Sequence, residues 1–181
     1  AVAVAVEPAQ MVWPTGSLEP RSVAVFLRNE AASGSRGEVS LEVPGGWKVS
    51  PESIPFDLAV EGMGSRFSFE LRPPGDLSEG RYVFRAVATV EDGARFDEAV
   101  DVIDYPHVER TLYLEDSELW VQALPLQVRG GIRVGYVMGS GDDGLAALRQ
   151  MGVDAEEVGP GRVRVGDFSG YDVLVLGIRV Y

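Results

Sequence analysis

The sequence has no cysteine and, among its 181 residues, only one histidine, His107, and one lysine, Lys48. Without cysteine the chain cannot form a disulfide, a thiolate metal site or a cysteine nucleophile. One histidine cannot build a histidine-rich zinc site, and it has no obvious partners for a Ser-His-Asp triad. We therefore expect no catalytic residue, no metal and no cofactor within this chain.

Basic residues are also scarce. The 28 acidic residues outnumber the 16 basic ones and give a formal charge of -12. A nucleic-acid-binding protein usually carries a basic face, and none is visible here, so we expect no nucleic-acid partner. We interpret the acidity as a solvated surface. A calcium-stabilised surface is the alternative, but it needs clustered carboxylates. The cluster Glu115–Glu118 is expected to be a solvated turn.

No apolar run is long enough to cross a membrane. The chain begins with Ala-Val-Ala-Val-Ala-Val, which is too short to span a bilayer and lacks the basic flank of a signal peptide. Its alternation of small and β-branched residues predicts a strand. Because no methionine precedes it and the C-terminus is abrupt, we expect an excised segment of a longer polypeptide.

Residues 1–104 carry the pattern of an all-β domain, with short apolar runs separated by Gly, Pro, Asn and Asp. In Arg66–Leu71 the side chains of Phe67, Phe69 and Leu71 fall on one face, because strand side chains alternate. We predict a mainly β, immunoglobulin-like sandwich. The expected strands are Val2–Val6, Ser22–Arg28, Gly37–Val43, Trp47–Val49, Phe56–Val60, Arg66–Arg72, Arg81–Val90 and Arg95–Ile103.

Residues 105–131 are predicted to be a connector with possible extra strands. Tyr105, Pro106 and His107 should end the last sandwich strand and mark the domain junction, since proline cannot donate to a sheet ladder. The apolar run Leu119–Val128 contains Pro125, which predicts that this strand is broken or lies at an edge.

In residues 132–181 the sequence pattern changes from strands alone to alternating strands and helix. It predicts the N-terminal part of a flavodoxin-like α/β domain that is incomplete. A buried strand from Ile132 to Met138 should lead into a helix from Gly144 that ends at Gly152. Strands are expected at Val153–Val158 and Val173–Ile178, the latter apolar throughout, as parallel strands are. A sheet that ends there leaves an apolar edge, so we expect self-association, with a homodimer formed through this edge.

The loop Gly139-Ser-Gly-Asp-Asp143 lies between a strand and a helix N-terminus, where anions are favoured. Gly139, Gly141, Asp142 and Asp143 could therefore bind a ligand. However, the two aspartates would compete with a phosphate, and the third glycine of a dinucleotide fingerprint is missing. Helix capping in a tight turn is the alternative that we favour.

Three tryptophans are candidates for glycan binding, because an indole face stacks on the apolar face of a sugar. Trp13, Trp47 and Trp120 could form such a surface platform. The alternative, which we favour, is that they fill the core of the sandwich.

Two stretches of the sequence resemble known families. Val43-Pro-Gly-Gly-Trp-Lys-Val-Ser-Pro51, Phe56–Leu58, Gly80–Tyr82 and Ile103–Val108 resemble the NPCBM-associated β-sandwich domain of α-galactosidases. Arg133–Asp143, Ala147–Val153 and Tyr171–Tyr181 are similar to the glutamine-amidotransferase-like region that follows such a sandwich in large bacterial PIG-L-type deacetylase proteins. Together the resemblance covers residues 20–181.

This resemblance implies a carbohydrate-related bacterial protein that is exported to the periplasm or the cell exterior. It also implies a parent protein with zinc-dependent deacetylase or hydrolase activity. No catalytic residue carries over, because the His-Pro-Asp-Asp motif of the deacetylases and the cysteine of the amidotransferases are both absent. The leading hypothesis is a non-catalytic spacer that contacts other domains of its parent. A carbohydrate-binding module is the alternative, and a hydrolase or amidotransferase fragment working at Gly139–Asp143 is the second alternative.

Overall fold

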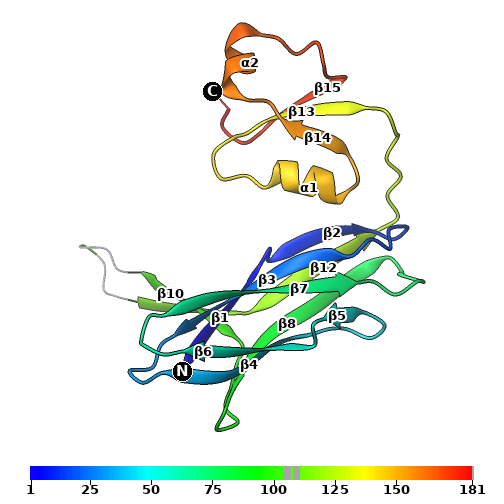
Figure 1. Cartoon of the computed structure of the whole chain (residues 1–181). Coiled ribbons are helices and arrows are strands. Elements are labelled where there is room, and N and C mark those ends of the chain that lie inside the picture. The colour runs from blue at the N-terminus through cyan, green and yellow to red at the C-terminus, as the bar shows by residue number, and fades with distance from the viewer. Residues whose placement is uncertain (104–106, 108–110, 181) are drawn as a thin grey trace.

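The computed structural model describes residues 1–103, 107 and 111–180. Most of the chain forms a β-sandwich, and the C-terminal residues form a small parallel sheet with α1 (Gly144–Gln150) on its sandwich side and α2 (Pro160–Val165) on the far side (Figure 1). The mainly β fold class is therefore confirmed. Among the described residues no helix is long and apolar enough to cross a membrane.

Four strands form the first sheet of the sandwich, and all their pairings are antiparallel. Their order across the sheet is β1-β3-β7-β5. The strands are β1 (Val2–Glu7), β3 (Arg21–Asn29), β7 (Gly64–Arg72) and β5 (Lys48–Ser50). In β7, Phe69 and Leu71 are buried and Phe67 packs beside them, as the alternating pattern predicts.

The second sheet has the order β2-β12-β8-β4-β6, and β9 pairs with the far end of β8. Its strands are β2 (Gln10–Pro14), β12 (Glu118–Leu124), β8 (Gly80–Val90), β4 (Ser35–Glu42), β6 (Ser53–Leu58) and β9 (Arg95–Phe96). β2 and β12 are parallel, and the other pairings are antiparallel. One apolar core joins the two sheets, with Leu27 and Phe69 from the first and Phe84 and Leu119 from the second.

Strand β12 comes from the segment predicted to be a connector. It lies between β2 and β8, and its alternate residues Leu119, Val121 and Ala123 are buried in the core. Pro125 directly follows the strand, which is consistent with a broken run but not with an edge strand. The sandwich thus continues to Leu124, because the alternation of β12 buries one of its faces.

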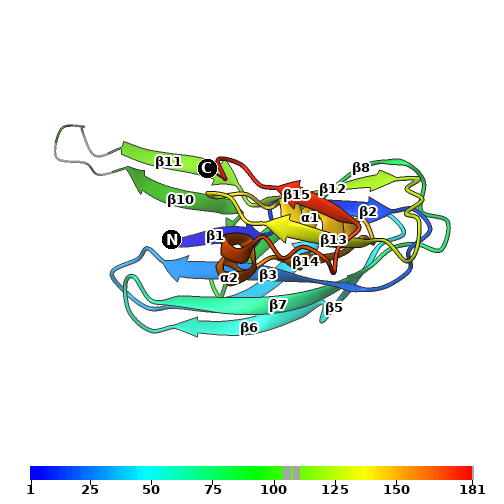
Figure 2. The same cartoon turned by 90° about the horizontal axis from the view of Figure 1, so that it is seen from above.

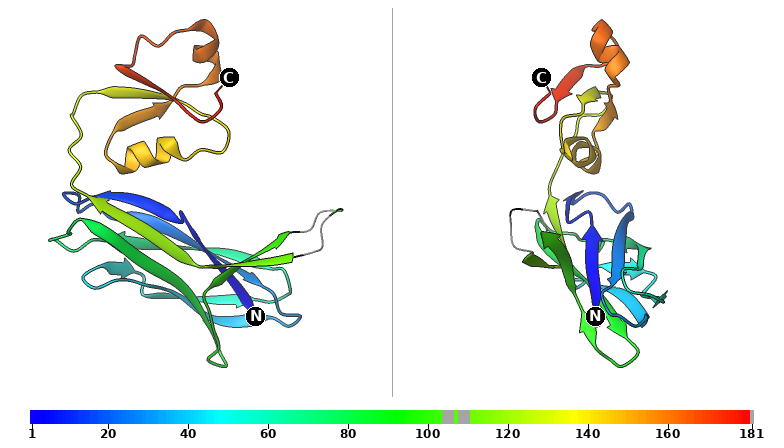
Figure 3. Two further views of the ribbon diagram at one scale, coloured as in Figure 1. Left: turned by 180° about the vertical axis from the view of Figure 1, so that it is seen from behind. Right: turned by 90° about the vertical axis from the view of Figure 1, so that its left-hand side faces the viewer.

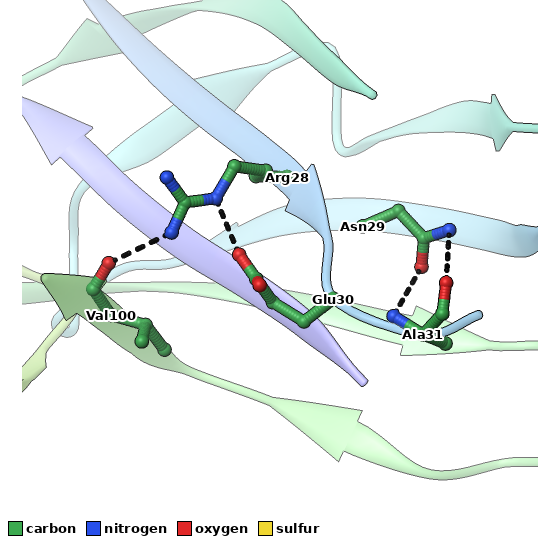
Figure 4. A network of polar contacts seen from close by, with 5 residues as sticks. All are labelled: Arg28, Asn29, Glu30, Ala31 and Val100. Atoms are coloured by element: carbon green, nitrogen blue, oxygen red, sulfur yellow. Dashed lines mark hydrogen bonds and ion pairs between the residues drawn. The ribbon is translucent and has the colours of Figure 1, made fainter. Parts of the chain in front are cut away.

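A two-stranded ribbon, β10 (Glu98–Ile103) and β11 (Thr111–Asp116), projects from the sandwich (Figure 2). It is fastened at its base by Arg28, whose Nη2 donates to the backbone oxygen of Val100 at 3.1 Å (Figure 4). Glu30 forms an ion pair with the same guanidinium. This contact joins the ribbon to the end of β3.

Asn29, at the end of β3, is the buried polar side chain that organises the following loop. Its Nδ2 donates to the backbone oxygen of Ala31 and its Oδ1 accepts from Ala31 N (Figure 4). Nδ2 also donates to the backbone oxygen of Ser33, and Oδ1 also accepts from Ser35 Oγ. Because a buried amide must have its hydrogen bonds satisfied, Asn29 holds the loop in one conformation.

The C-terminal part is a three-stranded parallel sheet in the order β14-β13-β15. Its elements are β13 (Arg133–Val137), α1 (Gly144–Gln150), β14 (Asp154–Glu157), α2 (Pro160–Val165) and β15 (Val173–Leu176). Helix α1 packs on the sheet through Leu145 beside Val134 and Tyr136. The short helix α2 was not anticipated from the sequence, because it buries none of its residues and has no apolar face to reveal it.

Gly152 ends α1 as predicted. It adopts a left-handed φ of 88° and donates to the oxygen of Arg149, while Val153 N donates to the oxygen of Leu148. This pair of hydrogen bonds is a Schellman motif, which favours glycine because a Cβ is strained at positive φ. In the views of Figure 3, α1 lies between the parallel sheet and the sandwich.

Candidate functional site

The predicted loop Gly139–Asp143 lies at the carboxyl end of β13, next to the residues that follow β15. In open parallel sheets, ligands bind at such ends where the strand order reverses. Here the position is filled by the side chain of Asp142. Its Oδ2 accepts hydrogen bonds from the backbone N–H groups of Gly139 and Ile178, both at 3.0 Å.

The second carboxylate oxygen of Asp142 is also occupied. Oδ1 accepts from the hydroxyl of Tyr136 at 2.6 Å and from the N–H of Gly144 at 3.2 Å. The hydrogen bond from Tyr136 is the main reason that the pKa of Asp142 lies below its ordinary value. The same hydrogen bond raises the pKa of the Tyr136 phenol, because it stabilises the protonated form.

These contacts support the capping and tight-turn interpretation of the loop. The amide groups that would cradle an anion already donate to Asp142, so a phosphate would have to displace a carboxylate. Gly139 and Gly141 contribute backbone, and Gly141 has a left-handed φ of 64°. Asp143 is the N-cap residue of α1 but makes no capping hydrogen bond through its side chain. Sequence reasoning missed Tyr136 and Ile178, which lie outside the loop.

The structure separates the three tryptophans. Trp13 and Trp47 are buried and stack edge to face with ring centroids 5.0 Å apart, and Trp47 also packs against Phe84. Neither can serve as the surface platform, because the two sheets enclose both rings; this corrects the hypothesis for these two residues. Trp120 points to the outer face of the second sheet and keeps 40% of its surface exposed.

Two neighbours hold Trp120 in place. The guanidinium of Arg81 lies 3.3 Å from the centroid of the indole ring, and the indole N–H donates to Glu118 at 2.9 Å. Glu118 in turn forms a 2.7 Å ion pair with Arg85. The hydrogen bond from Arg85 is the largest cause of the lowered pKa of Glu118. The predicted acidic cluster is thus partly an ion-pair network, and the described residues contain no group of acids and histidines that could hold a metal.

A cleft of about 660 Å³ opens beside Trp120, between the sandwich and α1. Its sandwich wall includes Gln10, Arg81 and Trp120, and its α1 wall includes Asp143 and Ala147. Such a volume lies in the range of small-molecule sites, about 300–1,000 Å³. A second, more apolar cavity of about 480 Å³ lies where β1, β3 and β7 meet the base of β10.

The two parts of the chain meet at Arg21 and Gln150. Arg21 stacks on Trp13 and donates to Val12 O at 2.5 Å and to Gln150 O at 2.7 Å. The side-chain oxygen of Gln150 accepts from Val12 N at 2.9 Å. Burial lowers the pKa of Arg21, because the junction removes its charge from water.

The sequence predicts the domain junction at Tyr105, Pro106 and His107. Tyr105 and Pro106 are outside the described residues. His107 is exposed and lies between β10 and β11. The chain enters the parallel sheet only after β12, through residues 125–132. The described part of the chain thus places the entry to the parallel sheet after β12, and the roles expected of Tyr105 and Pro106 stay predictions.

A comparison with protein families matches part of the sandwich. Residues 20–91 match the family model described as the NPCBM-associated, NEW3 domain of alpha-galactosidase. The matched residues run from the start of β3 to the end of β8. The match stops before the parallel sheet, so the resemblance to amidotransferases and PIG-L-type deacetylases stays a prediction. None of the curated proteins matches the chain.

Solved structures show weak overall similarity. A family 123 glycoside hydrolase from Clostridium perfringens is 8% identical over 76% of this chain and 31% of its own, with a TM-score of 0.39. The alpha-2-macroglobulin of E. coli is 14% identical over 67% of this chain and 7% of its own, with a TM-score of 0.42. The apo Calx CBD1 domain is 12% identical over 68% of this chain and 96% of its own, with a TM-score of 0.36.

This chain therefore spans less than a third of the first two of these proteins, and TM-scores this low support no conclusion about activity. The sequence match is the finding that bears on identity: residues 20–91 are similar to the NPCBM-associated NEW3 domain of alpha-galactosidase.

Proposed function

We propose that this chain is a non-catalytic accessory segment of a larger carbohydrate-related protein, in which the sandwich holds the α/β part in a set orientation. The observation that carries the proposal is the junction of Arg21, Val12 and Gln150. Two hydrogen bonds, from Arg21 to Gln150 O and from Val12 N to the side-chain oxygen of Gln150, join the two parts, and the partners of the half-buried Arg21 guanidinium replace the water that burial removes. A flexible linker would show no such contacts between its two sides.

The strand orders support the finer description of the two parts. β1-β3-β7-β5 corresponds to the A-B-E-D sheet of an immunoglobulin-like sandwich, and β12-β8-β4 corresponds to G-F-C. The order β14-β13-β15 corresponds to the 2-1-3 start of a flavodoxin-like sheet. We infer that the α/β part is the N-terminal portion of such a domain.

Non-catalytic action fits the loop after β13. The described donors around Asp142 all bind its carboxylate, so the amides that would stabilise an anionic reaction intermediate at this loop are already occupied. The link to carbohydrates rests on the NEW3 match, and export of the parent protein rests on the same family resemblance.

Backbone ¹⁵N relaxation tests the orientation role. In the wild type, the sandwich and the α/β part should tumble with one correlation time. Arg21→Ala removes two hydrogen bonds and the stacking on Trp13, and Gln150→Ala removes the acceptor of Val12 N, so both variants should give the two parts separate, shorter correlation times. Arg66→Ala is the matched control, because Arg66 lies near Phe26 and is remote from the junction. Two correlation times in the wild type would contradict the proposal.

A further inference from the structure

We propose that the cleft between the second sheet and α1 is a binding site for a neutral saccharide, with Trp120 and Arg81 as its platform. This activity goes beyond the orientation role, although it uses the docked arrangement of the two parts. The inference depends on three features of the cleft: a fixed aromatic surface, side chains that lack partners, and a balance of donors and acceptors.

The first feature is that Trp120 is both exposed and immobilised. The indole N–H is held by Glu118 at 2.9 Å, and Arg81 covers part of the ring. The residue still keeps 40% of its surface exposed. An aromatic side chain that is already fixed loses little conformational entropy when a ligand stacks on it, so its contact area contributes to affinity.

The second feature is a set of polar side chains without partners. Glu7, Gln10 and Asp143 line the cleft. Their side chains form no hydrogen bond or ion pair with any other residue that the structure describes. The guanidinium of Arg81 stacks on Trp120. Within the described part of the chain, it forms no ion pair or hydrogen bond. These groups remain available to a ligand, in contrast to the fully occupied Asp142.

The third feature is the chemistry of that set. Vicinal hydroxyls of a sugar accept hydrogen bonds from guanidinium and amide N–H groups and donate to carboxylates, and both kinds of partner are present. Glu7 and Asp143 outweigh the single charge of Arg81, which disfavours an anionic ligand. The small side chains of Ala146 and Ala147 line the α1 wall of the same cleft. A neutral saccharide matches the shape, the polarity and the charge of the cleft.

NMR titration of the intact chain tests this assignment. The indole N–H signals of Trp13, Trp47 and Trp120 can be assigned with single Trp→Phe variants. Galactose, glucose, mannose and N-acetylglucosamine, and disaccharides of each, are titrated separately. We expect at least one of them to shift the Trp120 signal in a saturable way, while the signals of the buried Trp13 and Trp47 stay in place.

Calorimetric titration of variants completes the test. Trp120→Ala and Gln10→Ala should each weaken binding of that sugar by about tenfold or more, as expected for a central contact. Tyr113→Ala is the matched control, since Tyr113 is an exposed aromatic residue of β11 outside the cleft, and it should bind like the wild type. Cooperative thermal unfolding, with melting temperatures within a few degrees of the wild type, confirms that the variants are folded.

Three results would overturn the assignment: no saturable shift with any of these sugars, undiminished affinity in Trp120→Ala, or tighter binding of glucuronate than of the neutral sugars. Failure of the saccharide site and failure of the orientation role can be distinguished. If sugars fail to bind while the two parts still tumble as one, only the saccharide site is refuted. If the parts tumble separately, the orientation role is refuted directly.

Discussion

The hydroxyl of Tyr136, at the centre of the parallel sheet, donates a 2.6 Å hydrogen bond to the carboxylate of Asp142 in the loop that follows. Through its other oxygen the same carboxylate binds the N–H of Ile178, 36 residues further along the chain. One side chain therefore ties the end of β13 to the segment after β15.

The first prediction concerns pH. The pKa of Asp142 is lowered in the folded chain, chiefly by Tyr136, so the unfolded chain binds more protons at low pH. The stabilisation is complete above the ordinary pKa of an aspartate, about 4, and is lost as pH falls through the lowered value. Asp142→Asn should remove this part of the acid dependence. Urea unfolding at a series of pH values measures it, and an unchanged acid dependence in Asp142→Asn would contradict the prediction.

The second prediction concerns Gly177. A Cβ at this position would lie 2.2 Å from Asp142 Oδ2 and 2.6 Å from the backbone nitrogen of Gly139. Gly177→Ala should therefore break the carboxylate contacts and destabilise the α/β part by about 1–3 kcal/mol, as overpacking does. Gly161→Ala in α2, where a Cβ meets nothing within 4 Å, should be neutral or stabilising. Hydrogen exchange of the β13 amides distinguishes the two variants, and equal protection in both would contradict the steric argument.

The third prediction contrasts the tryptophans. Trp47→Ala should destabilise the sandwich by about 3–5 kcal/mol, because it leaves a cavity beside Trp13 and Phe84. Trp120→Ala should cost only about 0.5–1 kcal/mol, the range of an exposed cation–π contact. Chemical denaturation gives both values. Similar losses of unfolding free energy in the two variants would contradict the difference in burial between Trp47 and Trp120.

The fourth prediction concerns Asn29. Asn29→Ala removes a buried amide and leaves Ala31 N and the oxygens of Ala31 and Ser33 without their partner in a partly buried site. The expected loss is about 1–3 kcal/mol. Ser33→Ala in the same loop is the matched control, since it keeps the backbone oxygen that Asn29 uses. If thermal unfolding gives the same melting temperature for both variants, Asn29 does not organise the loop.

The fifth prediction concerns the edge of the parallel sheet. Among the described residues β15 pairs with β13 alone, and Val173, Leu174, Leu176 and Ile178 are exposed. We expect this edge to pair with a further strand, and in the isolated chain with a second copy. Leu176→Lys should reduce concentration-dependent association, because edge lysines oppose strand pairing. Val165→Lys on α2 is the control. A wild type that stays monomeric in light scattering at high concentration would contradict the homodimer.

The sequence by itself determined the local elements. The alternation in β7 and β8 predicted sandwich strands. The end of α1 at Gly152 could be predicted because a residue with a left-handed φ is usually glycine. These features depend on neighbouring residues in the chain. The end of the sandwich was harder to predict from the sequence. Strand β12 follows the β10–β11 ribbon, and its partners β2 and β8 are distant from it in the chain.

Only the tertiary structure decided which polar and aromatic residues act together. Arg21 and Gln150 are 129 residues apart, and neither carries a local pattern that reveals the junction. The three tryptophans are chemically identical, yet the packing of two sheets buries Trp13 and Trp47 and leaves Trp120 beside the cleft. Burial and long-range hydrogen bonding depend on which surfaces meet in space. No short stretch of the sequence contains this information, because the surfaces that meet come from distant parts of the chain.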